Sequence, residues 1–126
     1  MSDARQRDTI LAALEIFMDE GFPRSLTTFT LFLYASENEG LTVSELAHVS
    51  SVQVSMAARV VKTLAGQAED FPIGDAGAIF ELRSAKDDKR LKFVFLTPRG
   101  QALRDRLDGL IAAAVPIAAS RPPEAA

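Results

Sequence analysis

Three polar side chains between residues 53 and 64 could contact the bases or phosphates of DNA. Ser55, Arg59 and Lys62 are spaced four and three residues apart, so they share one face if this segment is a helix. The Arg59 guanidinium can donate two parallel hydrogen bonds to a guanine, and Ser55 or Met56 could touch a base edge or a thymine methyl. Lys62 is expected to meet phosphate. An ordinary solvated helix face is the alternative interpretation.

A second group of charges lies between residues 78 and 100. Six cations stand there against Glu81, Asp87 and Asp88, a local excess of three positive charges. Such an excess can form a DNA-facing patch on an acidic protein, although a solvated surface of mixed charge is equally compatible with it. The lysines would add phosphate contacts that do not depend on sequence. The six cations are Arg83, Lys86, Lys89, Arg90, Lys92 and Arg99.

The composition is that of one ordinary soluble globular domain. Of the 126 residues, 48% are hydrophobic and 25% are charged. Cysteine is absent, which excludes disulfides, thiolate metal sites and cysteine nucleophiles. The net charge of -3 argues against a broadly basic nucleic-acid binder. The polar N-terminus lacks a signal-peptide core and no apolar run approaches the roughly 20 residues of a membrane span, so we expect a cytoplasmic protein without a membrane partner.

No combination of residues suggests an enzyme or a metal site. His48 is the one histidine, and it is predicted on the polar side of a short helix without a partner at metal-ligand spacing. Glu37, Glu39, Glu69 and Asp70 fall in predicted turns. Because nothing supplies a nucleophile, a base and an oxyanion site together, we expect no catalytic residue, no metal and no cofactor.

Two short helices joined by a tight turn are predicted between residues 42 and 65. Thr42 would cap the first helix, and Glu45 would reach back to the Thr42 amide. Residues 50–52 form the turn, and the second helix covers residues 53–64. This is a helix-turn-helix unit. The apolar residues at core spacing on its second helix are Ala57, Val60, Val61 and Leu64.

Two further helices are predicted before this unit. Residues 8–20 are amphipathic, and Gly21 to Pro23 stop that helix. Residues 26–37 are ambiguous, because their threonines and phenylalanines favour a strand. Their length and the spacing of Leu26, Phe29 and Leu33 fit a buried helix, which is the interpretation we adopt.

A loop, a hairpin and a last helix complete the chain. Residues 66–78 form a loop rich in glycine and acids, without a phosphate-binding motif. Strands are predicted at 79–83 and 91–96, with a charged tip at 84–90.

The last helix has a clear start signal. Thr97 would be the N-cap, with Pro98 at the first helical position. We predict that the helix continues to Val115, where Pro116 ends it. Residues 116–126 are expected to be a disordered tail.

From residue 26 to about residue 107 the order of elements resembles the MarR family of winged-helix transcriptional regulators. Residues 41–47, Leu-Thr-Val-Ser-Glu-Leu-Ala, resemble the start of that family's helix-turn-helix. Asp88-Lys89-Arg90, followed by Leu96-Thr97 and Gly100, resembles its wing motif in both identity and spacing. The resemblance implies a DNA-binding regulator, usually a homodimer and often derepressed by a small ligand.

The same resemblance implies a role for the hairpin tip. Arg90 would enter the minor groove of DNA, where a narrow A·T-rich tract concentrates negative potential. Asp88 could hold either the Arg90 guanidinium or the hairpin turn in place. A local surface ion pair worth at most about 1 kcal/mol is the alternative.

Two phenylalanines in the second strand are not explained by a DNA-binding wing. A half-buried strand alternates, so Val94 and Leu96 facing inward would leave Phe93 and Phe95 facing outward. We expect something to cover them. The candidates are the preceding loop through residues 71–73, Phe-Pro-Ile, and a partner subunit.

Together these features predict a mainly α fold with a small β-hairpin, a winged helix-turn-helix. Residues 1–115 would form a single domain, with the helix-turn-helix at 42–65, the wing at 79–96 and the tail at 116–126.

The function expected is that of a sequence-specific regulator of transcription that binds double-stranded DNA, acts as a repressor and can answer to a small-molecule effector. It would be a homodimer formed through residues 3–20 and 101–115. Two alternatives stay open: a winged helix used for protein–protein interaction, and a plasmid or phage replication or partition factor that binds DNA. The acidic balance, the two cations of the second helix and the outward phenylalanines favour the first alternative.

Overall fold

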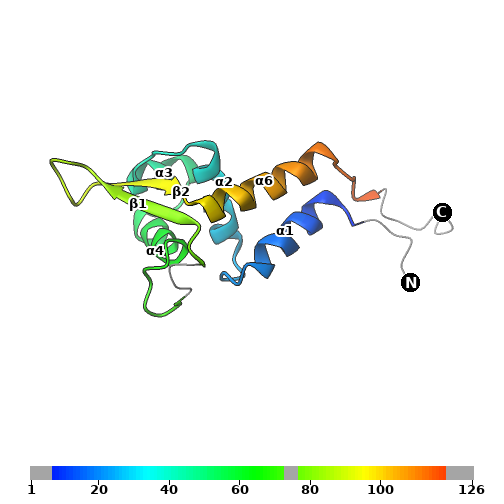
Figure 1. Cartoon of the computed structure of the whole chain (residues 1–126), viewed down its shortest axis with the longest axis horizontal. Coiled ribbons are helices and arrows are strands. Elements are labelled where there is room, and N and C mark those ends of the chain that lie inside the picture. Colours follow the sequence, from blue (N-terminus) through cyan, green and yellow to red (C-terminus); the bar gives the residue numbers. More distant parts are fainter. Residues whose placement is uncertain (1–6, 73–76, 119–126) are drawn as a thin grey trace.

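The computed structural model describes residues 7–72 and 77–118. Five helices and one antiparallel hairpin follow one another along these residues, as Figure 1 shows. The mainly α winged helix-turn-helix predicted from the sequence is therefore confirmed. The elements are α1 (Thr9–Asp19), α2 (Leu26–Glu37), α3 (Val43–Ser50), α4 (Val54–Leu64), β1 (Phe80–Ser84), β2 (Lys92–Leu96) and α6 (Pro98–Ala112).

Side-chain caps set the starts of four of these helices. Asp8, Ser25, Thr42 and Thr97 each accept a hydrogen bond from a backbone amide three residues later. The capping box predicted at the start of α3 is present in full, because Glu45 also accepts from the Thr42 amide at 2.9 Å.

Burial explains why residues 26–37 form a helix despite their strand propensity. Thr28, Leu31, Phe32 and Ala35 lie on one side of α2 and are almost fully buried. That side packs against α3, α4 and β2. The predicted helix is confirmed but its buried stripe is not the predicted one, since Leu26 and Leu33 are exposed. Tertiary packing of the observed stripe outweighs local propensity in this segment.

Five phenylalanine rings form the centre of the core. The Phe17 ring lies 5.5 Å from Phe22, 4.9 Å from Phe29 and 5.6 Å from Phe32, measured between ring centroids. Phe32 in turn stacks on Phe80 at 6.2 Å. Because aromatic rings bury large apolar areas, this cluster joins α1 to α2 and to the first strand of the hairpin.

The second strand of the hairpin is paired along both of its edges. On one edge β1 and β2 are antiparallel, from Phe80 opposite Leu96 to Ser84 opposite Lys92. On the other edge, Gly40 donates to the Val94 carbonyl at 2.8 Å and Val94 donates to the Leu41 carbonyl at 2.9 Å. This second pairing was not predicted from the sequence. It fixes the hairpin to the segment that leads into α3.

The first turn of α6 lies directly against the start of β1. The Thr97 amide donates to the Ile79 carbonyl at 3.1 Å, and the Thr97 hydroxyl donates to the Ala78 carbonyl at 2.8 Å while accepting from the Gly100 amide at 3.0 Å. A Cβ atom on Gly100 would lie 2.3 Å from the Ile79 carbonyl oxygen. This close contact explains why a glycine stands at position 100, three residues after the Thr97 cap.

The last helix ends earlier than predicted. It stops at Ala112 instead of Val115, four residues before Pro116. The chain leaves the helix because Val115 binds Thr9: the Thr9 amide donates to the Val115 carbonyl at 3.0 Å, and the Val115 amide donates to the Thr9 hydroxyl at 2.6 Å. Residues 119–126 of the expected tail lie outside the described residues.

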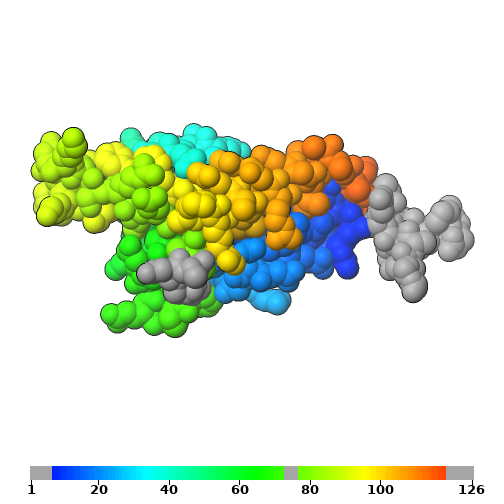
Figure 2. Space-filling view, in the orientation of Figure 1, coloured from blue at the N-terminus to red at the C-terminus, as the bar shows by residue number. Residues whose placement is uncertain are grey.

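Helices α1 and α6 pack side by side and project away from the hairpin (Figure 1). In the space-filling view the molecule is elongated, with the hairpin tip at one end and the start of α1 and the end of α6 toward the other (Figure 2). We call this pair of helices the arm.

The contact at Gly100 predicts a large difference between two Gly→Ala substitutions in the same helix. Gly100→Ala should lower the free energy of unfolding by about 2 kcal/mol, because the new methyl meets a backbone carbonyl that cannot easily move. Gly109→Ala meets nothing within 4 Å, and we expect it to be neutral or stabilising by up to about 1 kcal/mol. Urea unfolding of the three proteins measures both values. Equal stability of the two variants would contradict the assignment.

Candidate nucleic-acid interface

The outer face of α4 carries the side chains that the sequence analysis assigned to DNA contact. Ser55, Met56, Arg59 and Lys62 are exposed, and Met56 retains 40% of its accessible surface. The opposite face is buried against the core through Ala57, Val60, Val61 and Leu64, as predicted. The predicted orientation of the helix is therefore confirmed, and the stripe of Ser55, Arg59 and Lys62 is open to solvent.

A tight turn sets the direction of α4 relative to α3. Ser51 adopts a left-handed conformation with φ 57, and its amide donates to the His48 carbonyl at 3.2 Å. The Val52 amide donates to the Ala47 carbonyl at 3.0 Å. These bonds satisfy carbonyls in the last turn of α3, and α4 begins two residues after Val52, at Val54.

The hairpin tip presents Lys86, Lys89 and Arg90 to solvent. The Arg90 side chain is 93% exposed. Asp88 accepts from the Arg90 amide at 3.0 Å and from its Nε at 3.4 Å, so it holds both the turn and the guanidinium. Because a surface ion pair is weak, Arg90 can exchange this partner for a phosphate or a base at little cost.

Two other cations of the hairpin are engaged at its stem. Lys92 Nζ donates to the Ser84 hydroxyl at 2.8 Å across the strand pair. Arg83 forms an ion pair with Glu81 at 3.3 Å, and its guanidinium carbon lies 3.9 Å from the centroid of the Phe95 ring. The positive charge of the hairpin is therefore divided between an exposed tip and a stem in which cations already have partners.

Part of the cover over Phe95 comes from this chain, but not from the loop at 71–73 that the sequence suggested. One side of the ring is covered by Arg83, and Gly40, with φ +96, passes close enough that a Cβ atom there would lie 3.5 Å from the ring. Phe93 is half-buried beside Thr42, with which it forms a β-bridge. Phe71 lies instead in a hollow beside Glu20, and Ile73 falls outside the described residues.

The α4 stripe and the hairpin tip belong to the same end of the molecule. In Figure 1 the hairpin and α4 lie together, opposite the end where the start of α1 and the end of α6 meet. The DNA-contact residues predicted in two separate segments are thus presented at one end, on a helix and on a projecting loop.

Acidic side chains lie beside the α4 stripe, which the sequence analysis did not anticipate. A hollow of about 690 Å³ runs along the exposed side of this helix. It is lined by Ser55, Ala58, Arg59, Lys62, Gln67, Ala68, Glu69 and Asp70. The signal in the sequence is the pair of acids Glu69 and Asp70, three and four residues after Gly66, where only a turn is predicted.

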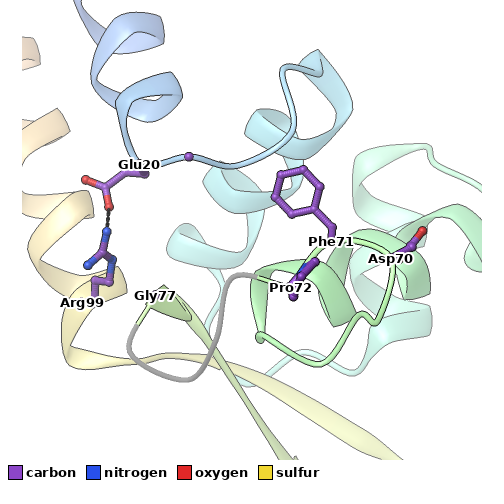
Figure 3. A pocket seen from close by; sticks show the side chains of 7 residues that line it. Glu20, Asp70, Phe71, Pro72, Gly77 and Arg99 are labelled. Carbon is purple, nitrogen blue, oxygen red and sulfur yellow. Dashed lines mark hydrogen bonds and ion pairs between the residues drawn. The ribbon is translucent and has the colours of Figure 1, made fainter.

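A second hollow, of about 500 Å³, separates the arm from the loop that follows α4. Figure 3 shows Glu20 and Arg99 on one side of it, with Phe71 and Pro72 on the other. Glu20 pairs with Arg99 at 2.6 Å and with Arg106 at 3.7 Å, and its side chain is only 15% exposed. The charge of Arg99 is therefore compensated within the hollow.

Within the described part of the chain, His48 does not belong to a group of metal-ligating side chains. His48 is exposed on α3. Within residues 7–72 and 77–118, no group of three or more metal-ligating side chains could hold an ion. No helix in the same part of the chain is both long enough and apolar enough to cross a membrane.

Comparison with solved structures identifies the architecture. A MarR transcriptional regulator from Methanosarcina mazei superposes with a TM-score of 0.61 at 14% identity, over 82% of this chain and 66% of that one. AbfR in its reduced form bound to DNA gives 0.61 at 14% identity, over 90% of this chain and 71% of that one. Staphylococcus aureus MarR in complex with salicylate and kanamycin gives 0.61 at 16% identity, over 82% and 61%.

The chain has a MarR-like winged-helix fold. The resemblance found from the sequence is confirmed at this level by these neighbours. No protein-family model matches the chain, and no curated protein matches it. The chain spans between 60% and 66% of the length of the first MarR structures that it matches.

Within this MarR-like fold, Glu39 anchors the hairpin to the rest of the structure. Its Oε2 atom accepts from the Leu96 amide at 2.9 Å, and its Oε1 atom lies 3.8 Å from a guanidinium nitrogen of Arg104 on α6. From the sequence, Glu39 is predicted only to lie in a turn. A contact across 57 residues leaves no local signal, so sequence reasoning could not find it.

Removing this carboxylate should loosen the hairpin. Glu39→Ala leaves the part-buried Leu96 amide without an acceptor, and we expect the free energy of unfolding to fall by about 1–2 kcal/mol. Glu39→Gln retains an acceptor oxygen and should lose less. Glu37→Ala, at an exposed position at the end of α2, is the matched control and should change little. Thermal unfolding and hydrogen exchange at the Leu96 amide measure the effect; unchanged exchange in Glu39→Ala would exclude this anchoring role.

Proposed function

We propose that this protein is a sequence-specific transcriptional regulator that binds double-stranded DNA through α4 and the hairpin tip. The observation that carries the proposal is the presence of an exposed polar stripe on α4 and an exposed Arg90 at the same end of a MarR-like winged helix. One structural neighbour, AbfR, is described as bound to DNA. The net charge of -3 is compatible with this function because the hairpin, residues 80–96, carries five cations against three acids.

Each exposed side chain has a proposed role in the complex. Arg59 pairs with a guanine in the major groove, while Ser55 and Met56 contact a base edge or a thymine methyl. Arg90 leaves Asp88 and enters the minor groove. The lysines bind phosphates and add affinity without sequence preference. These lysines are Lys62, Lys86, Lys89 and Lys92.

The proposal extends to assembly and regulation. A homodimer formed through the arm would present two copies of α4 to half-sites about one helical turn apart. Exposed apolar side chains on the arm support this interface: Ile10 is 63% exposed and Ile111 is 65% exposed. Repression in the cytoplasm, released by a small effector, completes the proposed function. A neighbour described in complex with salicylate and kanamycin supports the effector.

Two arginine substitutions test DNA binding. Arg59→Ala and Arg90→Ala should each weaken binding to a selected duplex by about tenfold or more, because each removes a base or groove contact. Arg24→Ala removes one exposed positive charge outside both elements and should change affinity far less. Mobility shifts at about 50 and 150 mM salt measure all four proteins. Absence of wild-type binding at the lower salt would exclude DNA as the partner and favour a protein–protein module.

Dimerisation through the arm has its own test. Ile10→Ser combined with Ile111→Ser removes two exposed apolar side chains and should convert a dimer to a monomer in sedimentation equilibrium. Leu26→Ser, at a position that is 73% exposed outside the arm, is the matched control and should leave the mass unchanged. A wild-type protein that sediments as a monomer at all concentrations would contradict the proposed assembly.

A further inference from the structure

The segment that follows α4 is turned back alongside that helix by its C-cap. Gly66 has φ +74, a conformation that glycine adopts without strain. The Gly66 amide donates to the Thr63 carbonyl at 3.1 Å and the Gln67 amide donates to the Lys62 carbonyl at 2.9 Å. This pair of bonds is a Schellman motif, and it fixes where residues 67–70 begin relative to the exposed stripe.

The returning segment also has a fixed end. The Ile79 amide donates to the Leu64 carbonyl at 2.9 Å, so the chain comes back to the last residue of α4 before β1 starts. The Gln67 bond attaches the start of residues 67–70 to the end of α4, and all four residues line a hollow along that helix.

Two acids and two cations face one hollow in this arrangement. Glu69 and Asp70 line it together with Arg59 and Lys62, and all four side chains belong to exposed residues. Among the described residues no hydrogen bond or ion pair joins the acids to the two cations. The formal charge around the hollow therefore sums to zero, although α4 itself contributes only positive charge.

We propose that Glu69 and Asp70 limit the affinity of α4 for the DNA backbone. The inference rests on the proposed function. Phosphates that approach Arg59 and Lys62 also approach these two carboxylates, and like charges repel. The attraction of α4 for duplex DNA of any sequence is reduced as a result, and binding depends more strongly on base contacts and on the hairpin tip. Glu69 and Asp70 act through the field around Arg59 and Lys62 and touch no base.

The double substitution Glu69→Gln with Asp70→Asn tests the proposal with the full chain. The probe is a duplex of about 25 base pairs with randomised sequence, and affinity is measured by fluorescence anisotropy from about 50 to 200 mM salt. The variant should bind about tenfold more tightly than wild type at the lowest salt, and little more tightly at the highest. The slope of log affinity against log salt should steepen by up to about two units, since two neutralised acids leave two more cations free to displace counterions.

Two comparisons separate this role from a structural one. Glu37→Gln removes one exposed acid at the end of α2 and should leave affinity and salt slope unchanged. In a background carrying Arg59→Ala and Lys62→Ala, the double substitution should lose most of its effect, because the cations it would release are absent. Melting temperatures should stay equal throughout, since neither acid has a hydrogen-bond partner among the described residues.

The outcomes distinguish the inference from the function on which it rests. If the Glu69→Gln, Asp70→Asn variant binds the duplex with the same affinity as the wild type, the inference is overturned and the proposed DNA-binding function stands. A full effect that persists without Arg59 and Lys62 also overturns it, because the acids would then act elsewhere. Failure of both the wild type and the double variant to bind the randomised duplex at the lowest salt removes the proposed function and the inference together.

Discussion

The backbone of Ile79 joins three parts of the molecule, and the arrangement of the other elements depends on it. Its amide is bound to the last residue of α4, and its carbonyl accepts from Thr97 at the start of α6. Its side chain is completely buried in the core. The end of α4, the base of the hairpin and the start of the arm are therefore held by one residue. Gly100 permits this arrangement because a Cβ atom at position 100 would lie 2.3 Å from the Ile79 carbonyl oxygen.

The number of contacts that hold the hairpin decreases from this junction toward its tip. Near the junction β2 is bonded on both edges, with Glu39 satisfying the Leu96 amide. Farther out, Arg83 stacks on Phe95 and Lys92 binds Ser84. At the tip, the one ion pair that Arg90 makes within the described residues is with Asp88. The cations with the fewest protein contacts are consequently those farthest from the core, where a ligand can reach them.

Local signals made most of the fold predictable. The capping box at Thr42, the threonine–proline start at Thr97 and the apolar spacing on α4 act within one or two helical turns, so the sequence alone located α3, α6 and the exposed stripe. The missed features join distant residues. Pairing of Val115 with Thr9 shortened α6, and the close approach of Gly40 covered Phe95. The acids beside α4 were visible as residues, but only the backbone turn at Gly66 shows that they face Arg59 and Lys62.

The arm is fastened near both of its ends. Thr9 and Val115 are bonded at the outer end, and Glu20 binds Arg99 and Arg106 at the inner end. Two helices clasped in this way cannot slide past each other without breaking one set of bonds, so they behave mechanically as a single rod. The inner end of this rod is bonded to Ile79 through Thr97, and Ile79 is bonded to the last residue of α4, so a tilt of the rod would be passed through these bonds to the helix that carries Arg59. In any assembly that pairs two copies of the chain through the arm, the angle of the arm would therefore set the distance between the two α4 helices.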